Sequence, residues 1–190
     1  MSTASRAPTW ALACSLHAEL FAAARDAGNI AVQLAYYGGL DFHTTDWSAT
    51  PSALLERMLD VRCVGGRTQI LRLLRHVSEE ARRHPLRALV FIGDCFEEDA
   101  DQAIIAAGEL AVFGVPAFIF QEGSEYGAGE VFGNIARLTG GAHVPFRPGS
   151  ADDLRNLLRA VATFASGGRG GLERSLANPM SSRLLTQLPP

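Results

Sequence analysis

Asp94 is the residue of this sequence whose position points most directly to chemistry. It follows an apolar run, residues 88–92, that carries no charge and includes β-branched and aromatic side chains, as in a strand buried on both faces. Open α/β sheets bind their ligands where strands end at the carboxyl edge, so a carboxylate placed there is a candidate site residue. The alternative is that Asp94 only begins a turn and caps the helix that follows.

Three hydroxyl side chains stand at comparable positions. Thr68 comes shortly after Gly65-Gly66 at the start of an expected helix, and Thr3 and Ser5 come just before the first expected helix. Each of them alone is typical of a helix N-cap. Together with Asp94 they would place one carboxylate and three hydroxyls on loops that can share the carboxyl edge of the sheet. Hard oxygen donors of this kind favour Mg²⁺ or a similar cation and do not suit zinc.

An alternation of strands and helices must position these residues. Apolar runs predict strands at residues 30–37, 40–47, 88–92, 115–120 and 142–146. Helical periodicity predicts helices at residues 8–27, 52–59, 68–83, 99–113, 130–139 and 150–166. We therefore expect an α/β fold with a doubly wound, mostly parallel sheet, an antiparallel edge hairpin and helices on both faces. The domain would span residues 1–166, and the Gly-, Ser- and Pro-containing tail, 167–190, would be partly disordered.

The composition narrows the class of protein. A chain of 190 residues with 47% hydrophobic content can bury the core of one domain. Its net charge of −3 and its dispersed basic residues give no sign of a nucleic-acid surface. Cys14, Cys63 and Cys95 lack metal-ligand spacing and are typical of reduced thiols. Because neither a membrane-spanning run nor a leader is recognisable, we expect a cytoplasmic protein.

Four segments occur in an order that resembles a known family. They are Gly66-Arg67-Thr68-Gln69-Ile70, the apolar run that ends in Asp94, Gly114-Val115-Pro116-Ala117-Phe118-Ile119, and Ile135-Ala136-Arg137-Leu138-Thr139-Gly140-Gly141. Over residues 1–165 this order resembles a von Willebrand factor A (VWA) domain, which is a Rossmann-like fold, and the last segment is the most specific. The resemblance implies a metal-ion-dependent adhesion site. In such a site an Asp-x-Ser-x-Ser loop, a Thr and a second Asp hold Mg²⁺, and the partner commonly supplies a carboxylate.

The resemblance assigns a metal-binding role to each of the four residues singled out above. Thr68 corresponds to the second-loop threonine and Asp94 to the third-loop aspartate. Thr3 and Ser5 match the two hydroxyls of the first loop, but Met1 stands where the acidic residue of that loop belongs. Since cation affinity in oxygen sites rises with ligand charge, we expect weak Mg²⁺ binding.

The resemblance also implies a first strand, which this sequence lacks, so we expect an N-terminally truncated domain. That strand would lie between those at 30–37 and 88–92. Neighbouring strands are about 4.8 Å apart, so its loss would leave a gap of roughly 10 Å. The resulting expectation is a cytoplasmic VWA-like protein-interaction module with an incomplete metal site, not an enzyme. Its partner would be another protein, whose acidic residue completes the site; neither nucleic acid nor a membrane is expected.

A small α/β hydrolase or phosphotransferase is the alternative from another functional class. Asp94 could be the nucleophile of a phosphotransferase, but no second Asp follows two residues later and the sequence contains no lysine. Cys95 could serve a cysteine hydrolase with His17, His76 or His143 as its base, although no local motif selects one of them.

Overall fold

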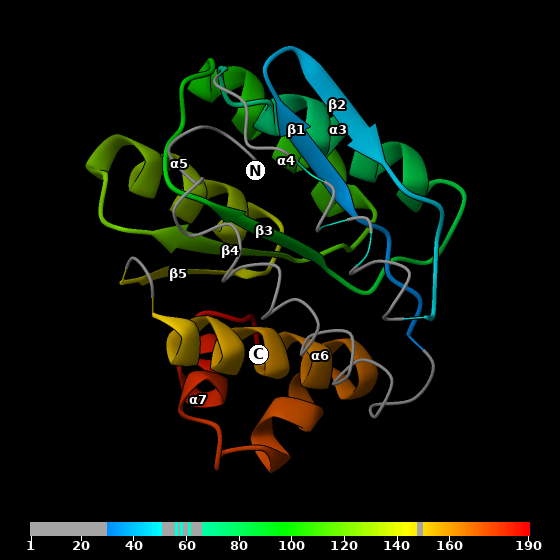
Figure 1. Ribbon diagram of the computed structural model, residues 1–190. Helices are drawn as coiled ribbons and strands as arrows, with labels where there is room; N and C mark the ends of the chain where they lie inside the picture. The colour runs from blue at the N-terminus through cyan, green and yellow to red at the C-terminus, as the bar shows by residue number, and fades with distance from the viewer. Residues whose placement is uncertain (1–29, 51–55, 57, 59–60, 62–65, 148–149) are drawn as a thin grey trace.

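The computed structural model describes residues 30–50, 56, 58, 61, 66–147 and 150–190. Its strands form two separate sheets (Figure 1). β1 (Ala35–Gly38) and β2 (Asp41–Thr44) pair antiparallel as the expected hairpin. β3 (Leu89–Gly93), β4 (Ala117–Glu122) and β5 (Ala142–Phe146) form a parallel sheet in that order. The mixed α/β fold expected from the sequence is confirmed.

Helices cover both faces of the parallel sheet, as expected for a doubly wound fold. α3 (Ile70–Ala81), α4 (Ala100–Val112) and α5 (Tyr126–Leu138) lie on one side. α6 (Ala151–Arg174) and α7 (Pro179–Leu185) lie on the other side (Figure 1). None of these helices combines the length and the apolar content that a membrane crossing would need.

β4 is the central strand, and the apolar run with which it begins, residues 117–120, follows from that position. All of its residues are buried. Because side chains alternate between the two faces of a strand, Ile119 enters the core beneath α3, α4 and α5, whereas Phe118 and Phe120 enter the core beneath α6. The two cores therefore share this strand.

The hairpin is not an edge of the parallel sheet in the described part of the chain, which corrects the expectation of one continuous sheet. β1 pairs with β2, and an isolated bridge between Val32 and Ser48 extends that pairing. The VWA resemblance implied a gap between the strand at 30–37 and the strand at 88–92, and no ladder joins β1 to β3 among the described residues.

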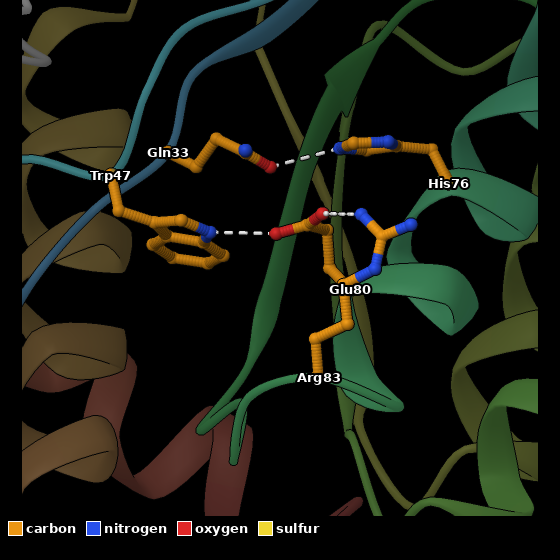
Figure 2. Close-up of polar contacts among 5 residues, drawn as sticks. All are labelled: Gln33, Trp47, His76, Glu80 and Arg83. Atoms are coloured by element: carbon orange, nitrogen blue, oxygen red, sulfur yellow. Dashed lines mark hydrogen bonds and ion pairs between the residues drawn. The ribbon is translucent and has the colours of Figure 1, made fainter.

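Polar side chains attach the hairpin segment to α3 (Figure 2). The indole Nε1 of Trp47 donates to Glu80 Oε2 at 2.7 Å, and His76 Nε2 lies 2.8 Å from Gln33 Oε1. Arg83 Nη1 is 3.4 Å from the other Glu80 oxygen. The largely buried Glu80 carboxylate thus has both a neutral and a cationic partner, which offsets the cost of removing it from water.

Contacts at the end of α5 explain the residue types of the segment Leu138-Thr139-Gly140-Gly141. The hydroxyl of Thr139, at the end of α5, accepts from the Ala117 backbone N–H at 3.0 Å and donates to the Ile135 carbonyl at 2.9 Å. Gly140 follows with φ 70°, a left-handed conformation that favours glycine at a helix end. A Cβ at Gly141 would overlap the carbonyl of Ala117, so only glycine fits there. These residues turn the chain from α5 into β5.

α5 begins earlier than the sequence predicted. The sequence predicted a helix from residue 130, but the helix begins at Tyr126. The carboxylate of Glu125 caps it by accepting from the N–H groups of Gly127 and Ala128. At Gly129 a Cβ would lie 3.2 Å from the Gln121 side chain, so the glycine reflects close helix–sheet packing and not a loop.

The residues after Gly167 also differ from the expected, partly disordered tail. α6 continues through a kink at Gly168 (φ 59°, ψ −156°) and is followed by α7. Leu172, Leu184 and Leu188 are buried in the core beneath α6, which is the physical reason for their order. The glycine and serine content of this segment indicated flexibility, but its leucines determine its structure.

The same C-terminal segment covers the outer edge of β5. Gln187 accepts from the His143 N–H at 2.9 Å and donates to the His143 carbonyl at 3.0 Å. Arg183 donates to the carbonyl of Pro145, a residue that has no N–H of its own. Side chains therefore satisfy backbone groups that an exposed edge strand would offer to another chain.

Gly108 lies in the middle of α4, and replacing it tests whether this part of the helix is free of contacts. A Cβ there would meet no atom within 4 Å. Since glycine in a helix interior costs about 0.5–1 kcal/mol relative to alanine, Gly108→Ala should raise the free energy of unfolding by about that amount. Urea denaturation in dilute solution measures it. Gly141→Ala is the matched control and should destabilise the protein; a loss of stability in Gly108→Ala would contradict this description of α4.

Candidate functional site

Thr68 lies against the loop that follows Asp94. Its side chain is only 3% exposed, and its Oγ1 accepts from the backbone N–H of Glu97 at 3.0 Å. Asp94 directly follows β3, three residues before Glu97. The structure therefore brings the loop of one predicted site residue into contact with the loop of the other, at the carboxyl edge of the parallel sheet.

Glu98 fixes the same two loops more firmly. Its two carboxylate oxygens accept from the backbone N–H groups of Ile70 at 2.5 Å and of Leu71 at 3.1 Å. Gln69, at the N-cap position of α3, makes no side-chain cap hydrogen bond. A carboxylate from a distant loop thus performs the capping, and its negative charge stabilises the positive end of the helix dipole.

The tip of the hairpin is held at this edge as well. The Gln69 side chain donates to the carbonyl oxygens of Gly39 at 3.3 Å and Asp41 at 3.1 Å. Arg72, one turn into α3, donates to the Leu40 carbonyl and lies over the Phe42 ring, 5.1 Å from its centre. Three segments that are far apart in sequence therefore meet around the start of α3.

Tyr37 lies inside this junction. Its side chain is 1% exposed, and burial raises its pKa well above the ordinary value. A hydrogen bond involving the Gln69 backbone partly offsets that effect, whereas the charges of Glu98, Cys95 and Asp94 raise the pKa further. The phenol therefore stays neutral and lies close enough to the acidic loop to sense its charge.

Cys95 has the properties of an inert thiol. Burial, followed by the negative charges of Asp94 and Glu97, raises its pKa to about 12, and its Sγ lies 3.7 Å from Asp94 Oδ1. A nucleophilic cysteine needs the opposite environment, one that favours the thiolate.

The histidines considered as bases for Cys95 have other partners or lie outside the described residues. His76 bonds to Gln33, and His143 lies 2.9 Å from Gln121 Oε1. Burial and the charge of Arg183 lower the pKa of His143. His17 lies outside the described residues.

The arrangement of strands and helices in this chain is similar to that of a solved structure. A von Willebrand factor type A protein from Catenulispora acidiphila superposes with a TM-score of 0.68 at 15% sequence identity, covering 87% of this chain. The chain has a VWA-like fold. It spans 41% of the length of that neighbour. No protein-family model matches the sequence, and no curated protein does.

Two of the four residues that the VWA resemblance assigned to Mg²⁺ can be placed. Thr68 and Asp94 lie on the contacting loops described above. Thr3 and Ser5, together with Met1, lie outside the described residues. Within the described part of the chain, no group of three or more His, Cys, Asp or Glu side chains could hold a metal ion.

The donor chemistry of Thr68 and Asp94 suits a hard cation, although it supplies a single carboxylate. The hydroxyl of Thr68 uses one lone pair for the Glu97 N–H and retains a second for a cation. The carboxylate of Asp94 provides the charge, and oxygen donors are those that Mg²⁺ prefers. In the kind of donor atom they supply, these two residues are compatible with the predicted magnesium site.

Sequence reasoning missed Glu98, Gln69 and Tyr37, whose contacts join the VWA-like loops. In the sequence, Glu98 is one member of an acidic group that follows Asp94. A cap is usually sought within a few residues of the helix it serves, whereas Glu98 is 28 residues from Ile70. No local signal in the sequence marks a cap supplied from that distance.

Replacing Glu98 tests the cap. Glu98→Ala should lower the free energy of unfolding by about 1–2 kcal/mol, because two N–H groups of α3 lose a charged acceptor. Urea denaturation measures the loss. Glu97→Ala is the matched control, since Glu97 contributes its backbone N–H and has an exposed side chain. Equal losses in the two variants would refute a specific role for the Glu98 carboxylate.

The reactivity of Cys95 tests its electrostatic surroundings. With a pKa near 12, its rate of alkylation by iodoacetamide should keep rising with pH up to about pH 10, because thiolate is the reactive form. Mass spectrometry of the peptide that contains Cys95 follows the reaction. Asp94→Asn should accelerate it by removing the neighbouring charge. A rate that reaches half of its maximum near pH 8.5, as for a free thiol, would contradict the prediction.

Proposed function

We propose that this chain is a protein-interaction module that binds an acidic side chain of a partner protein at the carboxyl edge of its parallel sheet. The observation that carries the proposal is the hydrogen bond from the Glu97 N–H to Thr68 Oγ1, 3.0 Å long. It joins the loop of the threonine to the loop that follows Asp94, as binding of one cation by both residues requires.

Electrostatics support a cation in this role. Asp94 and Glu97 both act on the Cys95 thiol, so two carboxylates lie within electrostatic range of one small region. A partner carboxylate approaching them alone would be repelled, since like charges disfavour one another. Mg²⁺ bound by Asp94 and Thr68, with Thr3 and Ser5 as further hydroxyl donors, would neutralise these two charges and offer a coordination position to the partner.

A binding role agrees better with the chemistry of this edge than hydrolysis does. The raised pKa of Cys95 opposes thiolate formation, and its candidate bases His76 and His143 bond to glutamine side chains. We therefore propose a module without enzymatic activity. A cytoplasmic location is part of the same proposal and rests on the unpatterned cysteines.

A magnesium titration tests this function. If the dissociation constant is about 1 mM, about 20 mM Mg²⁺ should stabilise the folded state by RT ln(1 + [L]/Kd), about 1.8 kcal/mol. Thermal melts at constant ionic strength measure the effect. Asp94→Asn and Thr68→Val should abolish it.

Asp152→Asn is the matched control for the titration, because it removes one carboxylate at the start of α6 on the other side of the sheet. This variant should respond to Mg²⁺ like the unmodified chain. The proposal fails if Mg²⁺ has no effect on the unmodified chain, or if Asp94→Asn responds as strongly as Asp152→Asn does.

A further inference from the structure

The turn of the hairpin carries an exposed leucine. Leu40 is 92% exposed and belongs to the two-residue turn between β1 and β2. Such turns favour glycine, asparagine or aspartate, and Gly39, with φ 61°, meets that preference at the first turn position. Because the side chain of Leu40 is almost fully exposed, neither turn formation nor core packing explains its residue type.

The turn is held against the loop of Thr68 on both sides of that residue. After Thr68, the Gln69 side chain donates to the Gly39 carbonyl oxygen at 3.3 Å. Before Thr68, a Cβ at Gly66 would lie only 2.6 Å from the backbone of Gly39, so the two chain segments touch. Leu40 therefore projects from a fixed backbone beside a predicted metal-binding residue, and little conformational entropy of the turn is lost when a partner contacts it.

Tyr126 is the counterpart of Leu40 across the loop that follows Asp94. It is the first residue of α5 and is 83% exposed. α4 begins at the end of that loop, lies between α3 and α5 (Figure 1) and contacts both helices. Besides burial and the charges within its own loop, the charge of Glu125, directly before Tyr126, also raises the pKa of Cys95. A large aliphatic and a large aromatic side chain therefore lie on opposite sides of the loop that follows Asp94.

Acidic side chains lie beside both of these exposed residues. Asp41 follows Leu40, Glu125 precedes Tyr126 and Glu130 lies one turn later on α5, and all three acidic residues are exposed. Because like charges disfavour one another, these carboxylates oppose a partner segment that carries several acidic residues in a row. A segment with a single acidic residue between uncharged apolar side chains suits this surface better.

We propose that the partner segment carries a large apolar side chain on each side of its acidic residue, one packing on Leu40 and the other on Tyr126. This inference rests on the proposed function, in which the acidic residue is bound at Thr68 and Asp94. Arg67, exposed directly before Thr68, adds a positive charge near the partner carboxylate. The site of the carboxylate makes an acidic residue necessary, and the two apolar contacts determine which acidic segments bind.

Selection of peptides on the full chain tests this preference. Random linear peptides displayed on phage are bound in the presence of Mg²⁺ and released with EDTA, so that metal-dependent binders are recovered. The recovered sequences should share one Asp or Glu with a large apolar residue a few positions away on each side. Selection on Leu40→Ser should lose the apolar preference on one side, and selection on Tyr126→Ser should lose it on the other side. Both variants should retain the preference for an acidic residue.

A double-mutant cycle tests whether the apolar contact is direct. Leu40→Ser should weaken the binding of a recovered peptide about tenfold, measured by fluorescence anisotropy. Replacing the peptide's own apolar residue by serine should weaken binding by a similar factor, and the two changes together should cause little further loss, because they remove the same contact. Val112→Ser is the matched control, since it removes an exposed apolar side chain from the end of α4, away from the carboxyl edge. This control should bind the peptide like the unmodified chain.

The outcomes separate this inference from the proposed function. Recovered peptides that share an acidic residue but no apolar neighbours would overturn the inference and leave the proposed function standing. Recovery of no peptide, or of peptides without an acidic preference, would contradict the proposed function and the inference together. An apolar preference that survives in both variants would overturn the inference alone. So would a dimer of the unmodified chain in sedimentation equilibrium that Leu40→Ser abolishes, because a second copy would then occupy this surface.

Discussion

The capping of α3 by Glu98 is the interaction on which the carboxyl edge of this VWA-like domain depends. The first N–H groups of a helix have no partner within it, and the residue before α3 offers none. Glu98 satisfies two of them from the loop after β3, which fixes the position of that loop and of Thr68 beneath it. The hydrogen bond that Thr68 Oγ1 accepts from the Glu97 N–H is a further link between the same two loops.

The acidic residues at this edge of the sheet fall into two groups, those that cap a helix and those that do not. Glu98, Asp99 and Glu125 each accept backbone N–H groups at the start of α3, α4 and α5, respectively. Their charges are balanced by the positive ends of helix dipoles and are part of the scaffold. Asp94 and Glu97 are the acidic residues of the β3–α4 loop whose carboxylates cap no helix, and they are therefore the ones left for a ligand.

Sequence patterns predicted the order of the elements better than their ends. The strands at 88–92 and 142–146 were identified because buried parallel strands have unbroken apolar runs. The loops of Thr68 and Asp94 were expected to meet at the carboxyl edge of the sheet, and they do, whereas the role of these residues in metal binding stays a prediction. The start of α5, the kinked end of α6 and the role of Glu98 were not predicted, since each depends on contacts with segments distant in the sequence.

Deamidation of Gln187 would change the contacts at the outer edge of β5. Its side-chain amide takes the place of a neighbouring peptide group, donating to the carbonyl of His143 and accepting from its N–H. Deamidation would leave a carboxylate, which has no hydrogen to donate and would face the carbonyl oxygen with a negative charge. Ageing at this single side chain would thus leave the His143 carbonyl without this donor, on the strand edge that the C-terminal segment covers.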